Sequence, residues 1–307
     1  MNLLVGGTGF IGGHVVEYLF QQGEISKGIF RKGSHLKIMD SSGVQGLEAD
    51  MLDHHSLHEA MEGVDTVYNM ASPMPGSDAD FQRFNGEGVL NLLEVAKESK
   101  VKTFVHLSTL DVHGFGAKRV DEATAFNPSN DYQKSKAEAE KQLIEFSKRN
   151  KEPRVAIIRS ARAIGSRDES LVVPLLRMVD SGAVTIPSTG NMSFSHPKDI
   201  AQAMYKTATG PLRERSLFLV KSFDSTPEEL ARAMVEALGA KVKVKKQGVF
   251  SSSPLPKYTA EQLKSSLRIE KQTSWKGLGY SPQFDLKTTS EEIAAWYKKE
   301  PWVTENA

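Results

Sequence analysis

Short apolar segments alternate with stretches of helical periodicity through the first half of the chain. The run Asn2-Leu3-Leu4-Val5 predicts a buried strand. From residue 10 to residue 20 the apolar positions recur at helical spacing, which predicts a helix packed on a sheet. The same alternation predicts strands at 27–30, 46–49, 66–71, 103–108 and 155–159, and helices at 56–61, 86–97, 135–149 and 171–180. This order favours a Rossmann-type α/β fold with a doubly wound parallel sheet.

The alternation loosens past Gly165, where a smaller α/β lobe is expected to begin. We therefore predict a Rossmann domain at 1–165 and a substrate-binding lobe at 166–307. Helices are predicted at 198–208, 227–238 and 290–299, a basic edge strand at 241–246 and a loop at 248–256. An apolar segment at 217–220 is expected to return to the main sheet as a further strand.

A glycine-rich segment joins the first predicted strand to the first predicted helix. Gly6 or Gly7 permits a tight turn, Gly9 allows a phosphate to approach the backbone, and Gly12 allows the helix to lie against the strand. The N–H groups around Phe10 and Ile11, at the start of the helix, would then face the anion. The context of strand, glycines and helix favours a dinucleotide site over a glycine-rich turn without a ligand.

The end of the second predicted strand bears on the choice between NAD and NADP. An acidic residue there usually binds the ribose 2′-OH of NAD, whereas an arginine accommodates the 2′-phosphate of NADP. This chain has Arg31 and Lys32 and no acid until Asp40. Arginine can make two charge-assisted bonds to a phosphate, so we favour NADP(H). NAD remains the alternative, with the basic residues then forming a solvated loop.

Composition limits the other classes of function. The 307 residues carry a formal net charge of +1, which gives no bulk electrostatic argument for nucleic acid or membrane. The absence of cysteine excludes disulfides and thiol ligands. The chain begins directly with a strand and has no apolar run of membrane-spanning length, so we expect a cytoplasmic protein. His54, His55 and His58 fit an exposed segment entering a helix better than a metal site, and no metal is expected.

Tyr132 and Lys136 stand one helical turn apart. An unperturbed phenol titrates near pH 10, and a neighbouring cation would lower the pKa of Tyr132 towards neutrality. Such a phenol can donate a proton to a carbonyl oxygen or remove one from an alcohol. The alternative is an aromatic residue that only covers the edge of the core.

Taken together, these segments resemble the extended short-chain dehydrogenase/reductase family along nearly the whole chain. The matching segments are GGTGFIG at 6–12, ADMLD at 49–53, NMASP at 69–73, FNGEG at 84–88, HLSTLDVHG at 106–114, YQKSK at 132–136 and SHPKDIA at 195–201. The resemblance implies that Asp50 and Met51 contact adenine and that Ala71 lies beside the nicotinamide ribose. It also implies that Lys136 bonds this ribose and that the Thr109 hydroxyl holds the substrate oxygen.

Further implications concern neighbouring residues and assembly. Ser108 is a weaker candidate than Thr109 for the hydroxyl, and Asn85 is expected in a structural and proton-relay role. His196 is expected to pack between the lobes. The family pairs two helices with their copies in a four-helix bundle, which implies a homodimer through 86–97 and the helix from Tyr132. The apolar residues Val89, Leu92, Leu93 and Ala96 favour this reading, and a helix buried within one chain is the alternative.

Departures from the family pattern bear on the substrate. Arg162 stands where nucleotide-sugar epimerases usually carry Asn, and Met192 stands where they often carry Arg. The acid that dehydratases place after their Thr is replaced by Leu110. The leading hypothesis is an NADP(H)-dependent reductase or dehydrogenase acting on a small-molecule ketone or secondary alcohol. The alternatives are a nucleotide-sugar epimerase or dehydratase using bound NAD(P), and a non-catalytic NADP-sensing or scaffold protein.

Overall fold

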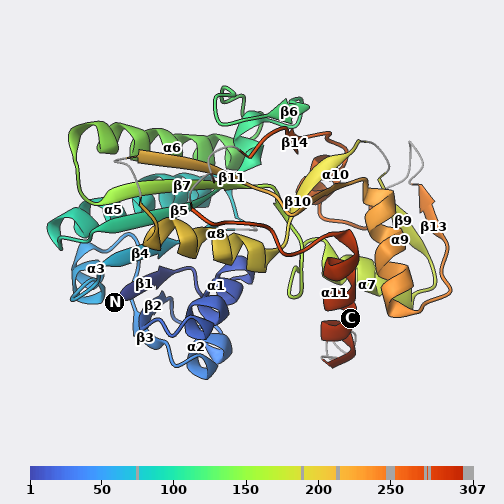
Figure 1. Cartoon of the computed structure of the whole chain (residues 1–307), viewed down its shortest axis with the longest axis horizontal. Coiled ribbons are helices and arrows are strands. Elements are labelled where there is room, and N and C mark those ends of the chain that lie inside the picture. The colour runs from blue at the N-terminus through green and yellow to red at the C-terminus, as the bar shows by residue number, and fades with distance from the viewer. Residues whose placement is uncertain are drawn as a thin grey trace.

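Seven parallel strands form the central sheet of the computed structural model (Figure 1). The structure describes residues 1–73, 76–187, 190–211, 215–246, 253–272, 275 and 278–299. The strand order is β11-β7-β5-β4-β1-β2-β3. The strands are β1 (Asn2–Val5), β2 (Ser26–Phe30), β3 (Gln45–Glu48), β4 (Thr66–Asn69), β5 (Thr103–Thr109), β7 (Arg154–Ser160) and β11 (Arg215–Val220). The predicted doubly wound α/β fold is confirmed.

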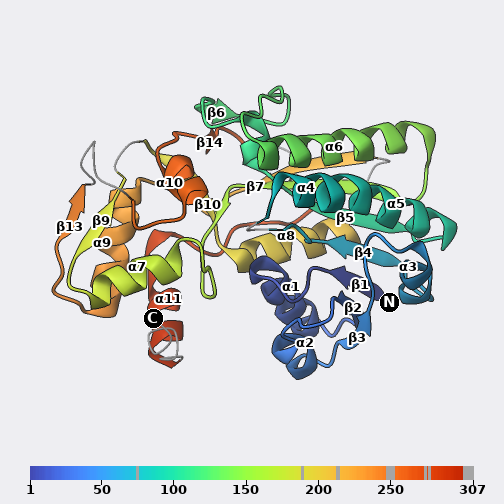
Figure 2. The ribbon, with the colours of Figure 1, turned by 180° about the vertical axis from the view of Figure 1, so that it is seen from behind.

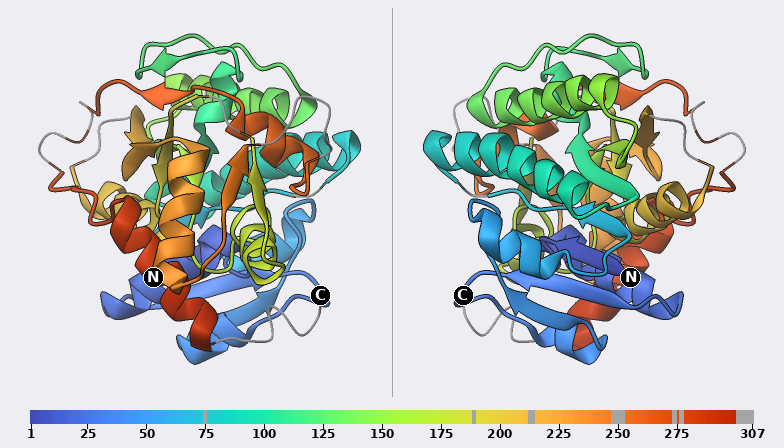
Figure 3. Two further views of the ribbon diagram at one scale, coloured as in Figure 1. Left: turned by 90° about the vertical axis from the view of Figure 1, so that its right-hand side faces the viewer. Right: turned by 90° about the vertical axis from the view of Figure 1, so that its left-hand side faces the viewer.

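Helices cover both faces of this sheet (Figures 1 and 2). One face carries α3 (His54–Ala60), α5 (Gly88–Glu98) and α6 (Asp131–Arg149), and the other carries α1 (Phe10–Gln21) and α8 (Pro197–Thr209), with α2 (Lys37–Ser41) beside α1. The alternation of strand side chains explains the two cores: Leu3 and Val5 pack under α3 and α5, whereas Leu4 packs under α1. Figure 3 shows these layers end-on, with α5 and α8 on opposite sides of the strands.

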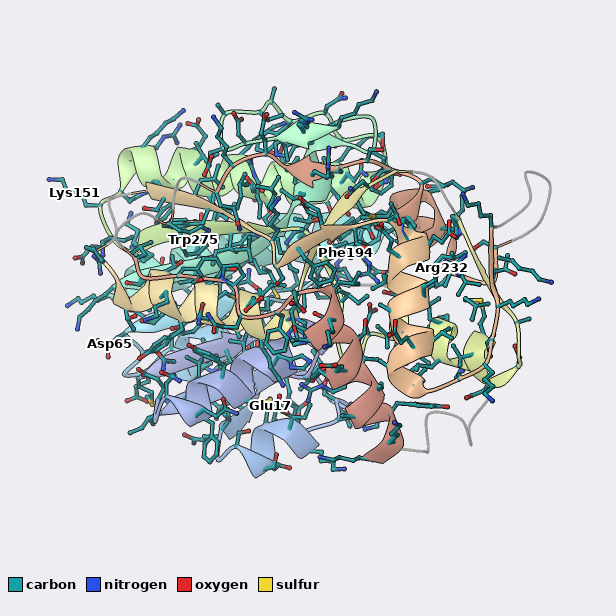
Figure 4. All side chains as sticks on the ribbon, turned by 45° about the vertical axis from the view of Figure 1, so that its right-hand side comes forward. Glu17, Asp65, Lys151, Phe194, Arg232 and Trp275 are labelled. Carbon is teal, nitrogen blue, oxygen red and sulfur yellow. The ribbon has the colours of Figure 1, made fainter. Side chains whose placement is uncertain are left out.

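The second half of the chain completes this sheet. As predicted, the segment containing 217–220 returns to it as β11, which pairs with β7. The helix α8 and Trp275 also pack on the main sheet, and the indole Nε1 of Trp275 donates to the carbonyl oxygen of Leu219 at 2.7 Å (Figure 4). The large core is therefore built from both halves of the sequence.

A smaller lobe lies beside the carboxyl ends of the strands, on the right of Figure 1. Its helices are α7 (Val172–Asp180), α9 (Pro227–Leu238), α10 (Lys257–Leu263) and α11 (Leu286–Lys299). Its short strands are β8 (Arg162–Ala163), β9 (Val184–Ile186), β10 (Met192–Ser195), β12 (Phe223–Ser225) and β13 (Val244–Lys246), while β14 (Arg268–Ile269) pairs with β6 (Arg119–Val120). Phe194 is fully buried in the separate apolar core of this lobe (Figure 4). The boundary at residue 165 stays a prediction.

Several element boundaries differ from the expectations. A π-helix (Phe81–Glu87) and the short α4 (Asp78–Asp80) precede α5, and α6 begins at Asp131 rather than at residue 135. The basic segment 241–246 forms a strand only in β13, which pairs with β9. The predicted loop 248–256 falls mainly outside the described residues. Within the ranges described above, no helix is both long and apolar enough to cross a bilayer.

Candidate active site

The glycine-rich turn after β1 forms a cradle open at the start of α1. Gly6 has a φ of +87°, and its carbonyl oxygen accepts the N–H of Gly9 at 3.1 Å. A Cβ on Gly12 would stand 1.9 Å from the Gly6 oxygen, so only glycine allows this approach. Around Gly9 a Cβ would meet nothing closer than 3.4 Å, which leaves that side of the turn open.

The first turn of α1 leaves its N–H groups free of side-chain caps. Its N-cap residue is Gly9, and no acidic residue lies among Phe10, Ile11 and their neighbours in this turn. Free N–H groups and the partial positive charge of a helix N-terminus suit a pyrophosphate. The residues present therefore fit a dinucleotide such as NAD(P), whose phosphates this cradle would hold.

Three further expected cofactor residues follow the carboxyl ends of β3 and β4. The carboxylate of Asp50 accepts the N–H of Leu52 at 2.9 Å, which forms a turn at the end of β3. Met51 is buried against α5, and its carbonyl oxygen accepts from Asn91 at 3.1 Å. A Cβ on Gly6 would stand 2.6 Å from the nitrogen of Ala71. The strand ends thus bring Gly6, Asp50, Met51 and Ala71 to one edge of the sheet, where open α/β folds bind ligands.

Arg31 lies at the end of β2 with an exposed side chain. Its guanidinium carbon stands 5.1 Å from the centroid of the Phe84 ring, within the range of a cation–π contact. In the part of the chain that the structure describes, Arg31 forms no ion pair. Its charge is therefore available to an anionic group at this edge.

The structure separates the two candidate hydroxyls at the end of β5. Ser108 is buried, and its hydroxyl donates to Glu140 of α6 at 2.5 Å. Thr109 is partly exposed, and its Oγ1 accepts the N–H of Asp111 at 3.1 Å, which caps a short 3₁₀ helix (Leu110–His113). The hydroxyl of Ser108 is thus occupied by its hydrogen bond to Glu140, and Thr109 is the hydroxyl that a ligand can reach.

Tyr132 is held at the first turn of α6. The side chain of Asn130 caps this helix by accepting the N–H of Gln133 at 2.9 Å. The Tyr132 ring meets the rings of Phe81 and Tyr258 edge to face, with centroids 5.5 and 5.3 Å apart. Burial raises the pKa of Tyr132 well above its ordinary value, and the nearby carboxylate of Asp111 adds to the shift. The phenol is therefore protonated at neutral pH.

Lys136 does not lower the pKa of Tyr132 here, contrary to the expectation from their spacing. Its Nζ instead donates to the carbonyl oxygen of Leu107 at 2.8 Å and lies 3.3 Å from Nε2 of His106. Burial lowers the pKa of Lys136 to about 8, although the carboxylate of Glu140 opposes the shift. The amine is thus held against β5, so it does not act as a cation on the phenol in this arrangement.

Sequence reasoning missed the residues that the small lobe contributes. Asp111 is buried, and its Oδ2 accepts from the hydroxyl of Tyr258 at 2.6 Å and from Nε2 of Gln262 at 2.7 Å. Tyr258 also packs against Phe115, with ring centroids 5.4 Å apart. Phe81, Tyr132, Tyr258 and Phe115 consequently form a continuous row of aromatic rings. No motif marks α10, so only the fold could reveal this contact.

The residues that depart from the epimerase pattern are held by the small lobe. Arg162 is 12% exposed and donates to Asp168 at 3.0 Å and to Ser170 at 2.7 Å.

His196 is buried between the lobes, as expected, and its ring stacks on Phe284 at a centroid distance of 3.6 Å. Among the described residues, no three His, Cys, Asp or Glu side chains converge as metal ligands.

Comparison with known proteins places this site in context. A model of the NAD dependent epimerase/dehydratase family matches residues 2–216, which is more than half of the chain. "Sterol demethylase protein B" of Methylococcus capsulatus is 28% identical over 174 residues, covering 54% of this chain and 52% of that protein. The human "Sterol-4-alpha-carboxylate 3-dehydrogenase, decarboxylating" is 29% identical over 191 residues, covering 58% and 48%. The chain thus spans about half the length of these two relatives.

The fold has close counterparts among solved structures. The UDP-glucose 4-epimerase from Bifidobacterium longum, solved in complex with NAD+ and UDP, superposes with a TM-score of 0.80. It covers 98% of both chains at 18% sequence identity. At this identity the likeness concerns the fold alone.

Proposed function

The chain belongs to the NAD dependent epimerase/dehydratase family, and from this premise we propose that it is an NADP(H)-dependent oxidoreductase that interconverts a ketone and a secondary alcohol. The proposed catalytic residues are Thr109, Tyr132 and Lys136. The observation that carries the proposal is that the protonated phenol of Tyr132 and the partly exposed hydroxyl of Thr109 both lie near Asp111, at the edge of the sheet that bears the dinucleotide cradle.

The proposed roles follow from the chemistry of each side chain. The Thr109 hydroxyl would orient the substrate carbonyl oxygen by donating to it. Tyr132 would then donate its phenolic proton to this oxygen. Bound NADPH would supply the hydride that the carbonyl carbon accepts, so the ketone becomes a secondary alcohol. Lys136 would bind the cofactor ribose, as the family resemblance implies.

NADP(H) is proposed over NAD(H) because Arg31 is exposed and free of ion pairs among the described residues. Replacing Arg31 with Asp should repel the 2′-phosphate and shift the preference to NAD, by roughly 30- to 150-fold in NADP affinity. Cofactor dissociation constants measured by calorimetry would test this change. Equal NADP affinity in wild type and variant would show that Arg31 does not read the phosphate.

An apolar substrate is proposed because the aromatic row of Phe81, Tyr132, Tyr258 and Phe115 adjoins the proton donor. The two curated relatives carry names of sterol enzymes, which supports a cyclic apolar ketone or alcohol. The epimerase alternative is supported by the fold. Arg162, which is bound by Asp168, stands where epimerases usually carry Asn and so counts against this alternative. The alternatives in which no cofactor is consumed would show no net NADPH oxidation in the test below.

The test measures NADPH consumption with a panel of cyclic and linear ketones. Tyr132→Phe keeps the ring but removes the proton donor, so turnover should fall by about 10²- to 10⁴-fold. Cofactor affinity should be unchanged, and a thermal melt should first show that the variant folds. Near-wild-type turnover in Tyr132→Phe would refute the mechanism. Epimerised nucleotide sugars without net NADPH consumption would favour the epimerase.

We also propose a homodimer through α5 and α6, but from a different observation than the apolar stripe that suggested it in the sequence. The apolar residues that suggested it, Val89, Leu92, Leu93 and Ala96, are buried within the single chain and give it no support. A groove between the two helices is instead lined by Leu90, Phe146 and Gln142, together with charged side chains such as Glu94 and Arg149. The Oε1 of Gln142 is buried and has no hydrogen-bond partner among the residues that the structure describes. Sedimentation as a monomer at micromolar concentration would contradict the dimer.

A further inference from the structure

His106 of β5 lies between two polar side chains below the proposed catalytic residues. Its Nδ1 stands 3.1 Å from Nδ2 of Asn69, and its Nε2 stands 3.3 Å from Nζ of Lys136. All three side chains are buried. Buried polar atoms need matched donors and acceptors, so the hydrogens in this row can be assigned from their neighbours.

The assignment starts at Asn69. Its Oδ1 accepts the backbone N–H of Ala71 at 3.2 Å, which fixes the orientation of the amide. The backbone of Gly6 lies close to the Ala71 nitrogen, because a Cβ on Gly6 would stand only 2.6 Å from it. The Nδ2 of Asn69 therefore faces His106 as a donor, and Nδ1 of His106 must accept.

The assignment then passes through the imidazole to Lys136. Burial, reinforced by Lys136, lowers the pKa of His106 well below its usual range, so the ring is neutral and carries one hydrogen. With Nδ1 accepting, this hydrogen is on Nε2 and faces Nζ of Lys136. An ammonium group has no lone pair to accept it, whereas a neutral amine has one. The amine keeps its own hydrogens, and it donates one of them to the carbonyl oxygen of Leu107 at 2.8 Å.

We propose that His106 is a positioning residue for Lys136: in the cofactor-free protein, whenever the Lys136 amine is neutral, His106 adopts the Nε2–H tautomer and donates this hydrogen to that amine. The row from Ala71 through Asn69 and His106 then holds the amine on β5. This assignment is independent of the proposed reaction, because it concerns only hydrogens within the chain.

The charge of the Lys136 amine sets the pH range in which this arrangement holds. Burial lowers its pKa to about 8, so above this pH the amine is neutral and below it the amine gains a proton. The titratable groups around it are Tyr132 and Glu140 on α6 and His106 on β5, with Arg159 of β7 bonded to Glu140. Arg159 neutralises Glu140, which limits the pull of this carboxylate towards the charged form of Lys136.

The first test reads the tautomer directly by nitrogen NMR of labelled histidine in the cofactor-free wild type. At about pH 9, above the pKa of Lys136, the ring of His106 should carry its hydrogen on Nε2. His113 is the internal reference, because its Nδ1 lies 3.0 Å from the Ala125 carbonyl and must carry the hydrogen instead. A His106 ring protonated on Nδ1, or on both nitrogens, would overturn the proposal.

The second test follows the titration of the labelled Lys136 side chain. Removing the donor in His106→Phe destabilises the neutral amine, so the titration midpoint should rise by about 0.5–1 pH unit. His106→Gln is the matched control, because its amide keeps a donor near the position of Nε2 and should leave the midpoint closer to that of the wild type. A midpoint that falls or stays unchanged in His106→Phe would overturn the proposal.

The two tests remain distinct from the test of the proposed function. Neither requires a substrate or a cofactor, so an inactive protein with the expected tautomer would count only against the oxidoreductase. An active reductase with His106 protonated on Nδ1 would count only against this positioning role. If His106→Phe fails to fold, the tautomer of the wild type still decides the question.

Discussion

Asp111 joins the two lobes through a single carboxylate. In Asp111→Leu both donors from α10, which share Oδ2, would lose their acceptor, which should cost about 1–3 kcal/mol of unfolding free energy for each donor left unsatisfied. We expect faster hydrogen exchange in α10 and a higher KM for the ketone, with cofactor affinity unchanged. Tyr258→Phe is the milder control, because it loses one bond and keeps the ring. Unchanged exchange in Asp111→Leu would show that the contact does not hold α10.

For single residues, the sequence predicts those features of the site that depend only on spacing along the chain. The glycines of the cradle and the pair Tyr132 and Lys136 follow from local rules of turns and helices. The direction of the Lys136 amine does not, because it depends on His106 and Leu107, about 30 residues away on another element. The raised pKa of Tyr132 likewise depends on burial and on Asp111. Whether the predicted residues carry the reaction stays a prediction.

Helix α6 is fastened to the sheet by a buried ion pair. Arg159 of β7 donates to Glu140 from Nε and Nη2 at 2.9 and 2.8 Å, and Ser108 donates to the same carboxylate. Arg159→Met would leave a buried carboxylate without its cation, so we expect a loss of about 3–5 kcal/mol in urea denaturation. Lys148→Ala, which breaks an exposed pair on the same helix, should change stability by less than about 1 kcal/mol. Similar losses in both variants would contradict this view.

The elements that the sequence predicts well are those with long apolar periodicity. The bounds of α9 (Pro227–Leu238) match the prediction because Pro227 opens the helix, the Thr226 and Glu229 side chains form a capping box, and Gly239 ends it. The helix α10 escapes prediction because its seven residues are too few to show a period. The π-helix before α5 is not predicted either, since the spacing of its apolar residues also fits an ordinary α-helix.

Contacts between α1 and the small lobe make stability of the whole molecule depend on pH. His14 is buried, its Nε2 lies 3.1 Å from the Ser166 carbonyl, and Arg167 pairs with Glu17 at 2.9 Å. Burial, followed by the charge of Arg167, lowers the pKa of His14 to about 3 from its model-peptide value of 6.5. The folded state then binds fewer protons than the unfolded state between these values, so this stabilisation is present above about pH 6.5 and is lost as the pH falls towards 3.

His14→Gln keeps a donor for Ser166 but removes the titrating ring. The fall in melting temperature between pH 7 and pH 5 should therefore be smaller in His14→Gln than in the wild type. His55→Gln, on the exposed face of α3, is the control and should leave the pH dependence unchanged. Parallel curves for the wild type and His14→Gln would rule out His14 as the source.

At the scale of the whole molecule, the sequence predicts the parallel sheet and the return of β11 but not how the lobes share a core. Trp275 packs on Phe218 with ring centroids 4.6 Å apart, and Ile200 and Met204 of α8 lie in the same core. These contacts join segments that have no periodic relation to each other, so pattern alone cannot predict them.

The late position of β11 and α8 also has a consequence for the order of synthesis. A ribosome releases β7 well before α8 and β11, and until then Ala156 and Ile158 lack the helix that covers them, while the outer edge of β7 is unpaired. The nascent chain thus carries an almost finished sheet with one unpaired edge and one face that α1 covers only in part. A translational pause in this interval would favour aggregation or capture by a chaperone, whereas a pause after β11 has left the ribosome would not.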